Sequence, residues 1–396
     1  MSPIPLPREL LVDDRTARMA WSRLAEPGDP VMTGLIAQLG AVDALAAIAE
    51  TDDRRFRGIQ DRAASTDLTA LPRAAAVLGA RIIVPGDDDW PTGLDDLLHP
   101  PPCLWAIGAG EPAGLRDRGV SIVGARTCSR YGASVAHDLA AGLAAHGRAI
   151  VSGAAFGIDR AAHDGALAAS GRTIAVLAGG LDRCYPSQHA GLIRAIAESC
   201  VVLSEVPPGG APTRYRFLQR NRLIAALTAG TVIVEAGLRS GSLNTAKHAR
   251  EVGRPIGAVP GPVTSAVSAG CHNGVREGWA TLVTDVAEVI DLVGRIGVDA
   301  APRRRAAVRP ADEVSEGDRL VLAVVPVRAP AEAQRIALHA GLPFPETLAA
   351  LGRLAVAGLV ARHGTRWKQV VQPRDEEPRE RPSVTRLAED ELRSEG

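Results

Sequence analysis

Between about residues 119 and 293, short apolar runs alternate with stretches of helical spacing, and this alternation constrains the fold more than any other feature. The runs are GVSIVGA, RAIVSGAA, RTIAVLAGG, CVVLSEVP, GTVIVEAG and RPIGAVPG. They are continuously apolar, which is typical of parallel strands buried on both faces. Segments between them, such as SVAHDLAAGLAAHG, place apolar residues at helical intervals. The pattern predicts an α/β fold with an extended Rossmann-like, doubly wound parallel sheet.

The flanking segments predict smaller parts on both sides of this sheet. Residues 1–80 have apolar residues at helical spacing and predict a helical module, either of the helix-hairpin-helix or SAM type or a plain helical cap. Residues 81–298 form the sheet domain, which opens with two short strands around RIIVPG and CLWAIG. Residues 299–317 predict a charged linker, 318–372 three helices and a hairpin in the order of a winged-helix domain, and 373–396 a disordered tail.

The composition excludes several classes of protein. The 396 residues include 45 basic and 45 acidic side chains, so a nucleic acid would have to bind at a local cluster of cations. Five cysteines without a CxxC pair predict reduced thiols rather than disulfides or a zinc ribbon. HExxH and paired ligand motifs are absent, so we expect no metal. No apolar run reaches the ~18 residues of a membrane span, and no signal peptide is recognisable, so we expect a soluble, cytoplasmic protein without membrane contact.

The loops that follow the strands are where an open parallel sheet binds its ligands. Several of them are rich in glycine and serine, which lets backbone N–H groups approach a phosphate closely, especially where a helix begins. Lys247 follows the last of these loops by about one helical turn. The predicted phosphate loops contain Gly124, Ser152, Gly153, Gly157, Gly179, Gly180, Ser240, Gly241 and Ser242.

These loops lack the motifs of common cofactor sites. The first has no GxGxxG spacing, no acidic residue closes the second strand, and the chain has no Gly-Lys-Ser/Thr loop, so we expect no nucleotide cofactor. Asp159 and His163 lie four residues apart and share a helix face. They are either a catalytic pair or groups that cap and orient the helix, and no third catalytic group accompanies them.

Residues 213–222, TRYRFLQRNR, contain four arginines and two of the chain's few aromatic residues. The segment follows the fourth strand, so it lies at the same edge of the sheet as the glycine-rich loops. Arginines bind phosphates and an aromatic ring stacks on an unpaired base. A single-stranded nucleic acid is therefore the predicted ligand of Arg214, Phe217, Arg220 and Arg222. In the alternative, Phe217 belongs to the core and the last two arginines pair with carboxylates such as Glu205 or Glu235.

Taken in order and spacing, the segments SIVGAR, SGAAFGID..AAH, YP..H, SE.PPG, F..RNR.IA.L and EAG..SGSL.TA resemble the DprA/Smf family of DNA-processing proteins over about residues 82–293. The resemblance implies a protein without enzymatic activity that binds single-stranded DNA, forms a homodimer, protects incoming DNA in natural transformation and loads the RecA recombinase. Carried onto this sequence, the DNA-binding residues are Arg126, Arg214, Phe217, Arg220, Asn221, Arg222 and Lys247. Cys271 and His272 depart from the family pattern GTN.LI..GA.

Two other functions were weighed against this one. Phosphoribohydrolases of the cytokinin-activating LOG class share a related Rossmann domain, but their PGGxGT loop and the catalytic glutamate after it are missing from EAGLRSGSLNTA. A regulator that binds duplex DNA needs a basic recognition helix. The stretch PFPETLAALGRLAVAGL has one arginine and one glutamate, so a protein contact is an equal alternative for the winged-helix domain.

Overall fold

The computed structural model describes residues 8–294, 299 and 314–370. The chain divides into two compact units, Met1–Pro302 and Arg303–Gly396. The predicted tail and most of the predicted linker, residues 300–313, lie outside the described residues.

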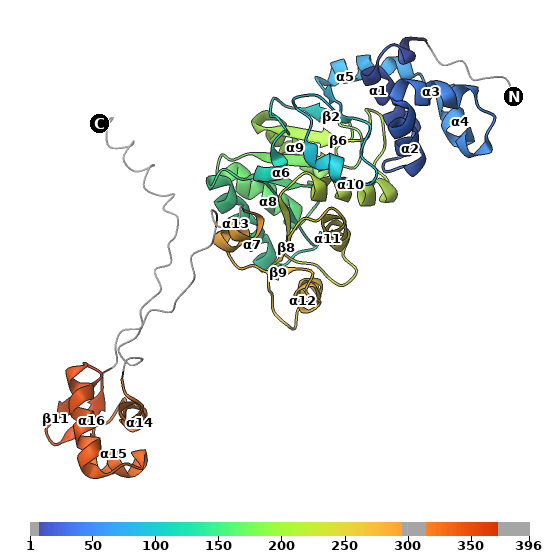
Figure 1. Cartoon of the computed structure of the whole chain (residues 1–396). Coiled ribbons are helices and arrows are strands. Elements are labelled where there is room, and N and C mark those ends of the chain that lie inside the picture. The colour runs from blue at the N-terminus through green and yellow to red at the C-terminus, as the bar shows by residue number, and fades with distance from the viewer. Residues whose placement is uncertain (1–7, 295–298, 300–313, 371–396) are drawn as a thin grey trace, which may run out of the picture. The chain divides into compact units, whose positions relative to one another are not determined.

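A mixed sheet forms the centre of the first unit (Figure 1). In the described residues it has nine strands, in the order β1-β2-β6-β5-β4-β3-β7-β8-β9. The seven strands from β6 to the end of this order, β6-β5-β4-β3-β7-β8-β9, are parallel to one another. Strand β2 pairs antiparallel with both β1 and β6. The strands are β1 (Arg81–Ile83), β2 (Leu104–Ile107), β3 (Gly119–Val123), β4 (Ala149–Ser152), β5 (Thr173–Leu177), β6 (Val201–Ser204), β7 (Gly230–Ile233), β8 (Ile256–Ala258) and β9 (Thr281–Leu282).

The six predicted strands are confirmed as β3 to β8, and the order in which they pair is doubly wound. From β3 the chain moves outward through β4, β5 and β6, and then returns to β7 on the other side of β3. The direction of winding therefore reverses between β3 and β7. In open parallel sheets, ligands bind beyond the carboxyl ends of the strands at such a reversal.

Helices cover both faces of the sheet, which is why its strands are apolar throughout. In β3, Val120 and Ile122 pack with α7 and α8, whereas Val151 of β4 packs with Leu223 and Ile224 on the opposite face. Helices α7, α8, α9 and α13 share the first face, and α10 and α11 share the second. The helices are α6 (Leu115–Arg118), α7 (Arg130–Ala145), α8 (Ile158–Ala168), α9 (Ala190–Ser199), α10 (Arg214–Ala226), α11 (Ser242–Glu251), α12 (Ala269–Arg276) and α13 (Val286–Val293).

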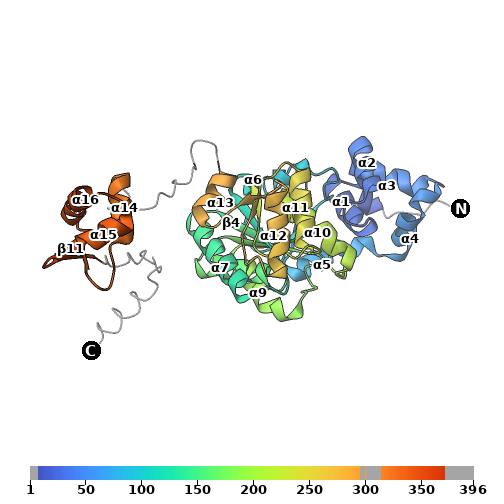
Figure 2. The ribbon, with the colours of Figure 1, turned by 90° about the horizontal axis from the view of Figure 1, so that it is seen from below.

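The N-terminal helices join the sheet instead of forming a compact unit of their own. Trp21 and Leu24 share one hydrophobic cluster with Trp105 of β2, Leu177 of β5 and Ile196 of α9. The predicted boundary at residue 80 therefore separates helices from a sheet inside the first unit, and does not separate two compact units. Figures 1 and 2 show these helices gathered at one end of the unit, with α7 and α13 at the other. They are α1 (Asp14–Leu24), α2 (Pro30–Leu39), α3 (Ala41–Glu50), α4 (Arg57–Ser65) and α5 (Leu71–Leu78).

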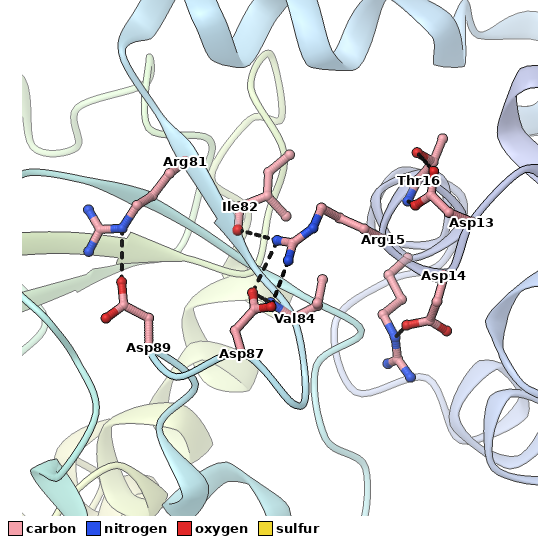
Figure 3. A network of polar contacts seen from close by, with 10 residues as sticks. Asp13, Asp14, Arg15, Thr16, Arg81, Ile82, Val84, Asp87 and Asp89 are labelled. Atoms are coloured by element: carbon pink, nitrogen blue, oxygen red, sulfur yellow. Dashed lines mark hydrogen bonds and ion pairs between the residues drawn. The ribbon is translucent and has the colours of Figure 1, made fainter.

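Polar contacts also connect α1 to the edge of the sheet (Figure 3). Arg15 donates hydrogen bonds to the carbonyl oxygen of Ile82 at 2.8 Å and to Asp87 at 2.6 Å. Asp87 in turn accepts a hydrogen bond from the backbone N–H of Val84, at 2.9 Å, and so closes the turn after β1. The position of the N-terminal helices is thus determined by both apolar packing and polar contacts.

The second unit has three helices and a three-stranded sheet in its described residues. Their order agrees with the predicted order of helices and hairpin, while the assignment to the winged-helix family stays a prediction. Arg353 of α16 forms a salt bridge of 2.6 Å with Asp318, so the only arginine of the predicted recognition helix is paired within the unit. The elements are α14 (Glu316–Val324), β10 (Ala331–Glu332), α15 (Ala333–Ala340), α16 (Phe344–Val356), β11 (Val360–His363) and β12 (Arg366–Gln369).

Helices α2 and α3 are two apolar helices that follow one another directly in the chain. They meet at Gly40, whose positive φ of 79° ends α2, and the bend between them is 114°. Within residues 8–294 and 314–370, no single helix is both long and apolar enough to cross a membrane, although this bent pair reaches that length and composition.

Candidate nucleic-acid interface

A cleft of about 500 Å³ opens at the carboxyl ends of β3, β4 and β7, where the winding of the sheet reverses. Its lining comes from segments far apart in sequence: the loops after these three strands, α10 from Phe217 to Ile224, the start of α11, and Val267. The lining includes Arg126, Phe217, Arg239 and Ser240. The cleft and the adjacent loops after β3, β4, β5 and β7, together with the start of α10, are called the rim below.

Phe217 is at the centre of an aromatic and cationic cluster on this rim. The guanidinium carbon of Arg126 lies 5.0 Å from the centroid of the Phe217 ring. The ring of Tyr185, from the loop after β5, meets Phe217 edge to face, with centroids 5.3 Å apart. The partly exposed Phe217 is therefore a rim residue, and the alternative that it belongs to the core does not hold.

Three exposed arginines of the rim, Arg126, Arg214 and Arg239, differ from the exposed Arg183, which pairs with Asp182 at 3.3 Å. Within the described residues, the side chains of these three arginines have neither an ion pair nor a hydrogen bond. Arg126 and Arg214 are two of the predicted DNA-binding residues, and that role stays a prediction. Arg239 was missed, because a single arginine in the loop LRSGS carries no signal beyond its charge.

Arg220 lies beneath the surface and acts as a support. Its Nη1 atom donates to the carbonyl oxygens of Gly153 and Val176, at 2.8 and 2.6 Å, and only 6% of the residue is exposed. Burial lowers the pKa of Arg220 to about 10, and the carboxylate of Asp159 opposes this shift. Its guanidinium carbon is 6.0 Å from the Phe217 ring, so Arg220 positions that ring from below.

Asp159 and His163 have separate structural partners, which favours the structural alternative over a catalytic pair. Asp159 accepts hydrogen bonds from the backbone N–H groups of Gly153 and Ala155, at 3.2 and 3.4 Å. Burial raises the pKa of Asp159 despite the nearby Arg220. His163 shares a hydrogen bond of 2.7 Å with Thr173, and burial lowers its pKa to about 3.

Arg222 was predicted to bind DNA, but the structure buries it in an ion pair. Its Nη2 atom donates to both oxygens of Glu205, each at 2.6 Å, and 5% of each side chain is exposed. This is one of the pairings expected in the alternative, and it withdraws Arg222 from the surface. Arg216 is likewise engaged, by Glu26 of the N-terminal helices at 2.9 Å. The cationic segment thus divides into exposed and structural arginines.

Asn221 and Lys247 also differ from the prediction. The amide nitrogen of Asn221 donates to the carbonyl oxygen of Gly241 at 3.3 Å and to Asn244 at 3.2 Å, so this side chain fastens the loop after β7 to α10. It still contributes to the lining of the cleft. Lys247 is exposed next to Glu251, at 3.7 Å, and is not among the lining residues.

The helix starts at the rim are satisfied from within the protein, which corrects the predicted phosphate loops. At the start of α7, the N–H and hydroxyl groups of Ser129 donate to the two carboxylate oxygens of Glu235, at 2.8 and 2.6 Å. At the start of α11, the N–H of Ser242 donates to the Ser240 hydroxyl at 3.4 Å, and that of Asn244 to the Gly241 carbonyl at 3.1 Å. The cations of the rim, rather than these backbone groups, remain available to phosphates.

Other small residues of the predicted loops make room for protein atoms. Ser152 is fully buried and donates to the Ile122 carbonyl at 2.7 Å. A Cβ atom at Gly153 would collide with the guanidinium group of Arg220. The remaining glycines are similarly close to the protein: Gly124 to Ile158, Gly157 to the Ala125 carbonyl, Gly179 to Pro212 and Gly180 to Pro207.

Two exposed aromatic residues, Phe156 and Tyr185, were not predicted as site residues. Both stand in loops after strands, within the segments FGID and YP..H that carried the family resemblance. An exposed ring next to a glycine-rich loop is the signal that could have identified them. In the described part of the chain, no three His, Cys, Asp or Glu side chains gather into a potential metal site.

Comparison with known proteins relates this arrangement to one family. Residues 81–294 match the family model described as DNA recombination-mediator protein A. A protein of Mycobacterium tuberculosis, named putative DNA processing protein DprA, is 43% identical over 378 residues, which cover 90% of this chain and 95% of that protein. Protein Smf of Escherichia coli is 36% identical over 293 residues, 70% of this chain and 75% of the relative. The X-ray structure of DNA processing protein A from Streptococcus pneumoniae shares 32% identity, with a TM-score of 0.61 over 70% of this chain and 97% of that one.

Proposed function

The chain belongs to the DNA recombination-mediator protein A family, whose members are also named DprA or Smf, and on this premise we propose that it binds single-stranded DNA along the rim. The observation that carries the proposal is the cluster of Arg126, Phe217 and Tyr185 beside the cleft. Aromatic rings accept unpaired bases of any sequence, and arginines bind the backbone between them.

The distribution of charge supports a single strand over a small anion. The protein has no net charge, yet three exposed arginines without an ion pair lie on the rim, and two of them, Arg126 and Arg239, line the cleft. The helix starts that would hold a compact phosphate are satisfied by Glu235 and by Ser240. A ligand with several phosphates spaced along a chain suits dispersed cations better than one phosphate group does.

A duplex is less suited to this rim than a single strand. In a duplex, the faces of the bases are stacked on one another and cannot reach Phe217 or Tyr185. Unpaired bases expose these faces, so the rings contribute binding energy only with single strands. We therefore propose a preference for single-stranded DNA that depends on salt and only weakly on sequence.

Membership in this family supports a role in recombination, and we extend the proposal to it. The protein would protect incoming single strands, act as a homodimer and load the RecA recombinase onto the bound strand. A contact of the C-terminal unit with another protein also fits, because the only arginine of α16 is paired with Asp318.

The burial and hydrogen bonds of the carboxylates near the cleft favour a binding protein rather than a LOG-type hydrolase. Asp159 is buried and accepts two backbone hydrogen bonds, and both oxygens of Glu235 are engaged by Ser129. A general base must reach the proton that it removes, with a pKa matched to that task. Both residues are buried, with 6% of Asp159 and 1% of Glu235 exposed, which supports a structural role for them.

A titration of labelled single-stranded and duplex oligonucleotides of equal length tests the proposed function. Wild type and Arg126→Ala are compared at two salt concentrations, with Arg216→Ala as a matched control whose arginine is already paired with Glu26. We expect salt-sensitive binding that prefers the single strand and that is weakened by Arg126→Ala alone. Equal affinity for both forms, or equal effects of the two variants, would contradict a single-strand site on the rim.

A further inference from the structure

We propose that Phe156 is a second base-stacking ring, so that the bound strand continues from the cleft across the loop after β4. This inference rests on the proposed single-strand function and adds a binding position to it. Phe156 is 44% exposed, although burial of a phenylalanine side chain would stabilise the folded protein. Tyr185, which contacts Phe217, is 51% exposed on the same rim.

Residues on both sides of Phe156 have positive φ angles, and one of them, Ala154, carries a Cβ atom. Ala154 is fully buried and has a φ of 50°, in the left-handed region that residues with a Cβ atom seldom occupy. Gly157 has a φ of 79°, and a Cβ atom there would collide with the carbonyl oxygens of Ala125 and Arg126. Such conformations persist where the surroundings enforce them and cluster at functional sites.

A buried histidine supports this loop from below. His189 is fully buried, and its Nδ1 atom donates a hydrogen bond of 2.9 Å to the carbonyl oxygen of Ala154. Its ring also meets the Phe156 ring edge to face, with centroids 4.7 Å apart and planes at 68°. The same side chain thus fixes the strained residue and the exposed ring, so Phe156 is preorganised for a ligand.

One short segment connects this ring to the cluster at the cleft. Tyr185 contacts Phe217, and His189, four residues later, contacts Phe156. Four residues span at most ~14 Å between their Cα atoms, so both aromatic contacts lie along one part of the rim. Since a single strand is a flexible chain of bases, successive bases can reach both rings.

Phe156 also has a more accessible face than Phe217. Arg126 and Tyr185 already contact the ring of Phe217, which a base must share with them or displace. Among the residues that the structure describes, His189 is the only ring in contact with Phe156, and no cation lies over it. A base can therefore stack on Phe156 without displacing a side chain of the protein.

The test compares an oligothymidine with an oligonucleotide of the same length in which every base is replaced by an abasic site. Affinities are measured by fluorescence anisotropy for the full-length wild type, Phe156→Ala, Phe156→Tyr and Phe217→Ala. Leu98→Ala is the control, since Leu98 is 86% exposed and lies before β2, outside the rim. Thermal unfolding of each variant accompanies the titrations.

We expect Phe156→Ala to weaken oligothymidine binding by about five-fold or more. Its affinity for the abasic strand should stay unchanged, and Phe156→Tyr and Leu98→Ala should bind as wild type does. A loss of equal size for both strands would show that Phe156 supports the fold instead of stacking on a base.

Two further outcomes separate this inference from the proposed function. If Phe217→Ala weakens oligothymidine binding and Phe156→Ala does not, the second stacking position is wrong while the single-strand site stands. If Phe156→Ala bound oligothymidine as wild type does but formed an assembly of different mass in sedimentation, the Phe156 ring would belong to a protein interface. If the wild type binds neither strand, both the function and the inference fail.

Discussion

Arg222 donates from one nitrogen to both carboxylate oxygens of Glu205, at 2.6 Å each, and only 5% of either side chain is exposed. The pair joins α10 to the loop after β6. Burial raises the pKa of Glu205, and Arg222 opposes that shift. The helix that carries the exposed Arg214 and the partly exposed Phe217 is thus anchored by a buried ion pair.

Removal of this anchor should destabilise the protein. Arg222→Ala leaves the carboxylate of Glu205 buried without its partner, so the free energy of unfolding should fall by about 3–5 kcal/mol. Denaturant-induced unfolding of the first unit measures the change. Arg214→Ala is the control, because that side chain is exposed. A difference between the two variants of less than about 0.5 kcal/mol would contradict a structural role for Arg222.

Two arginines of one helical turn should differ in their effect on DNA binding. Arg214 is exposed, whereas Arg216 forms an ion pair with Glu26 at 2.9 Å. Each phosphate contact adds about 0.7 to the slope of log K against log salt for single strands, so Arg214→Ala should reduce the slope by up to that amount. Arg216→Ala should leave the slope as in wild type. Equal slopes for both variants would mean that Arg214 touches no phosphate.

Gly153 should tolerate no side chain. A Cβ atom there would collide with the guanidinium group of Arg220, so Gly153→Ala should displace Arg220 and the Phe217 ring above it. We expect a loss of about 1–3 kcal/mol in stability, together with weaker single-strand binding. Gly191→Ala in α9 is the control, because nothing lies near its Cβ position. If Gly153→Ala bound single-stranded DNA as tightly as wild type, the position of Arg220 would not matter for binding.

The buried His163 predicts how stability depends on pH. Burial, with Arg220 and His189 nearby, lowers its pKa from 6.5 to about 3. Below pH 6.5 the unfolded chain binds a proton that the folded protein excludes, so stability falls as the pH falls from 6.5 towards 3. Between pH 6.5 and 5 the loss should be about 2 kcal/mol. Denaturation of wild type and His163→Gln at both pH values isolates this contribution. An identical pH dependence in both proteins would contradict it.

The strands of the parallel sheet were predictable because burial on both faces leaves a continuous apolar run in the sequence. Val120 to Val123 and Ile150 to Val151 are examples, with neighbouring residues in opposite clusters. The antiparallel pairing of β2 with β6 was not predicted. It depends on contacts between residues about a hundred positions apart, such as Trp105 with Ser204, which leave no local pattern.

The candidate site was predictable in position and only partly in its residues. Residue type and the order of the strands placed Arg126, Arg214 and Phe217 at the carboxyl edge of the sheet. Charge alone could not distinguish Arg214 from Arg222, because the difference is made by Glu205, which the fold brings to one arginine and not to the other. Likewise, the glycines indicated close approach, but not that Arg220 was the group approaching Gly153.

The carboxylate of Glu235 binds at the start of α7, where an anion could otherwise bind. Its carboxylate is 1% exposed and fills the N-terminus of α7, the place where a Rossmann-like sheet ordinarily offers its first anion site. Gly132 has no Cβ atom where that carboxylate lies. A side chain of the protein thus occupies the place at which an anion would otherwise bind. Replacement of this one glutamate by a small residue would give protein engineers a vacant anion site inside an otherwise intact DNA-processing scaffold.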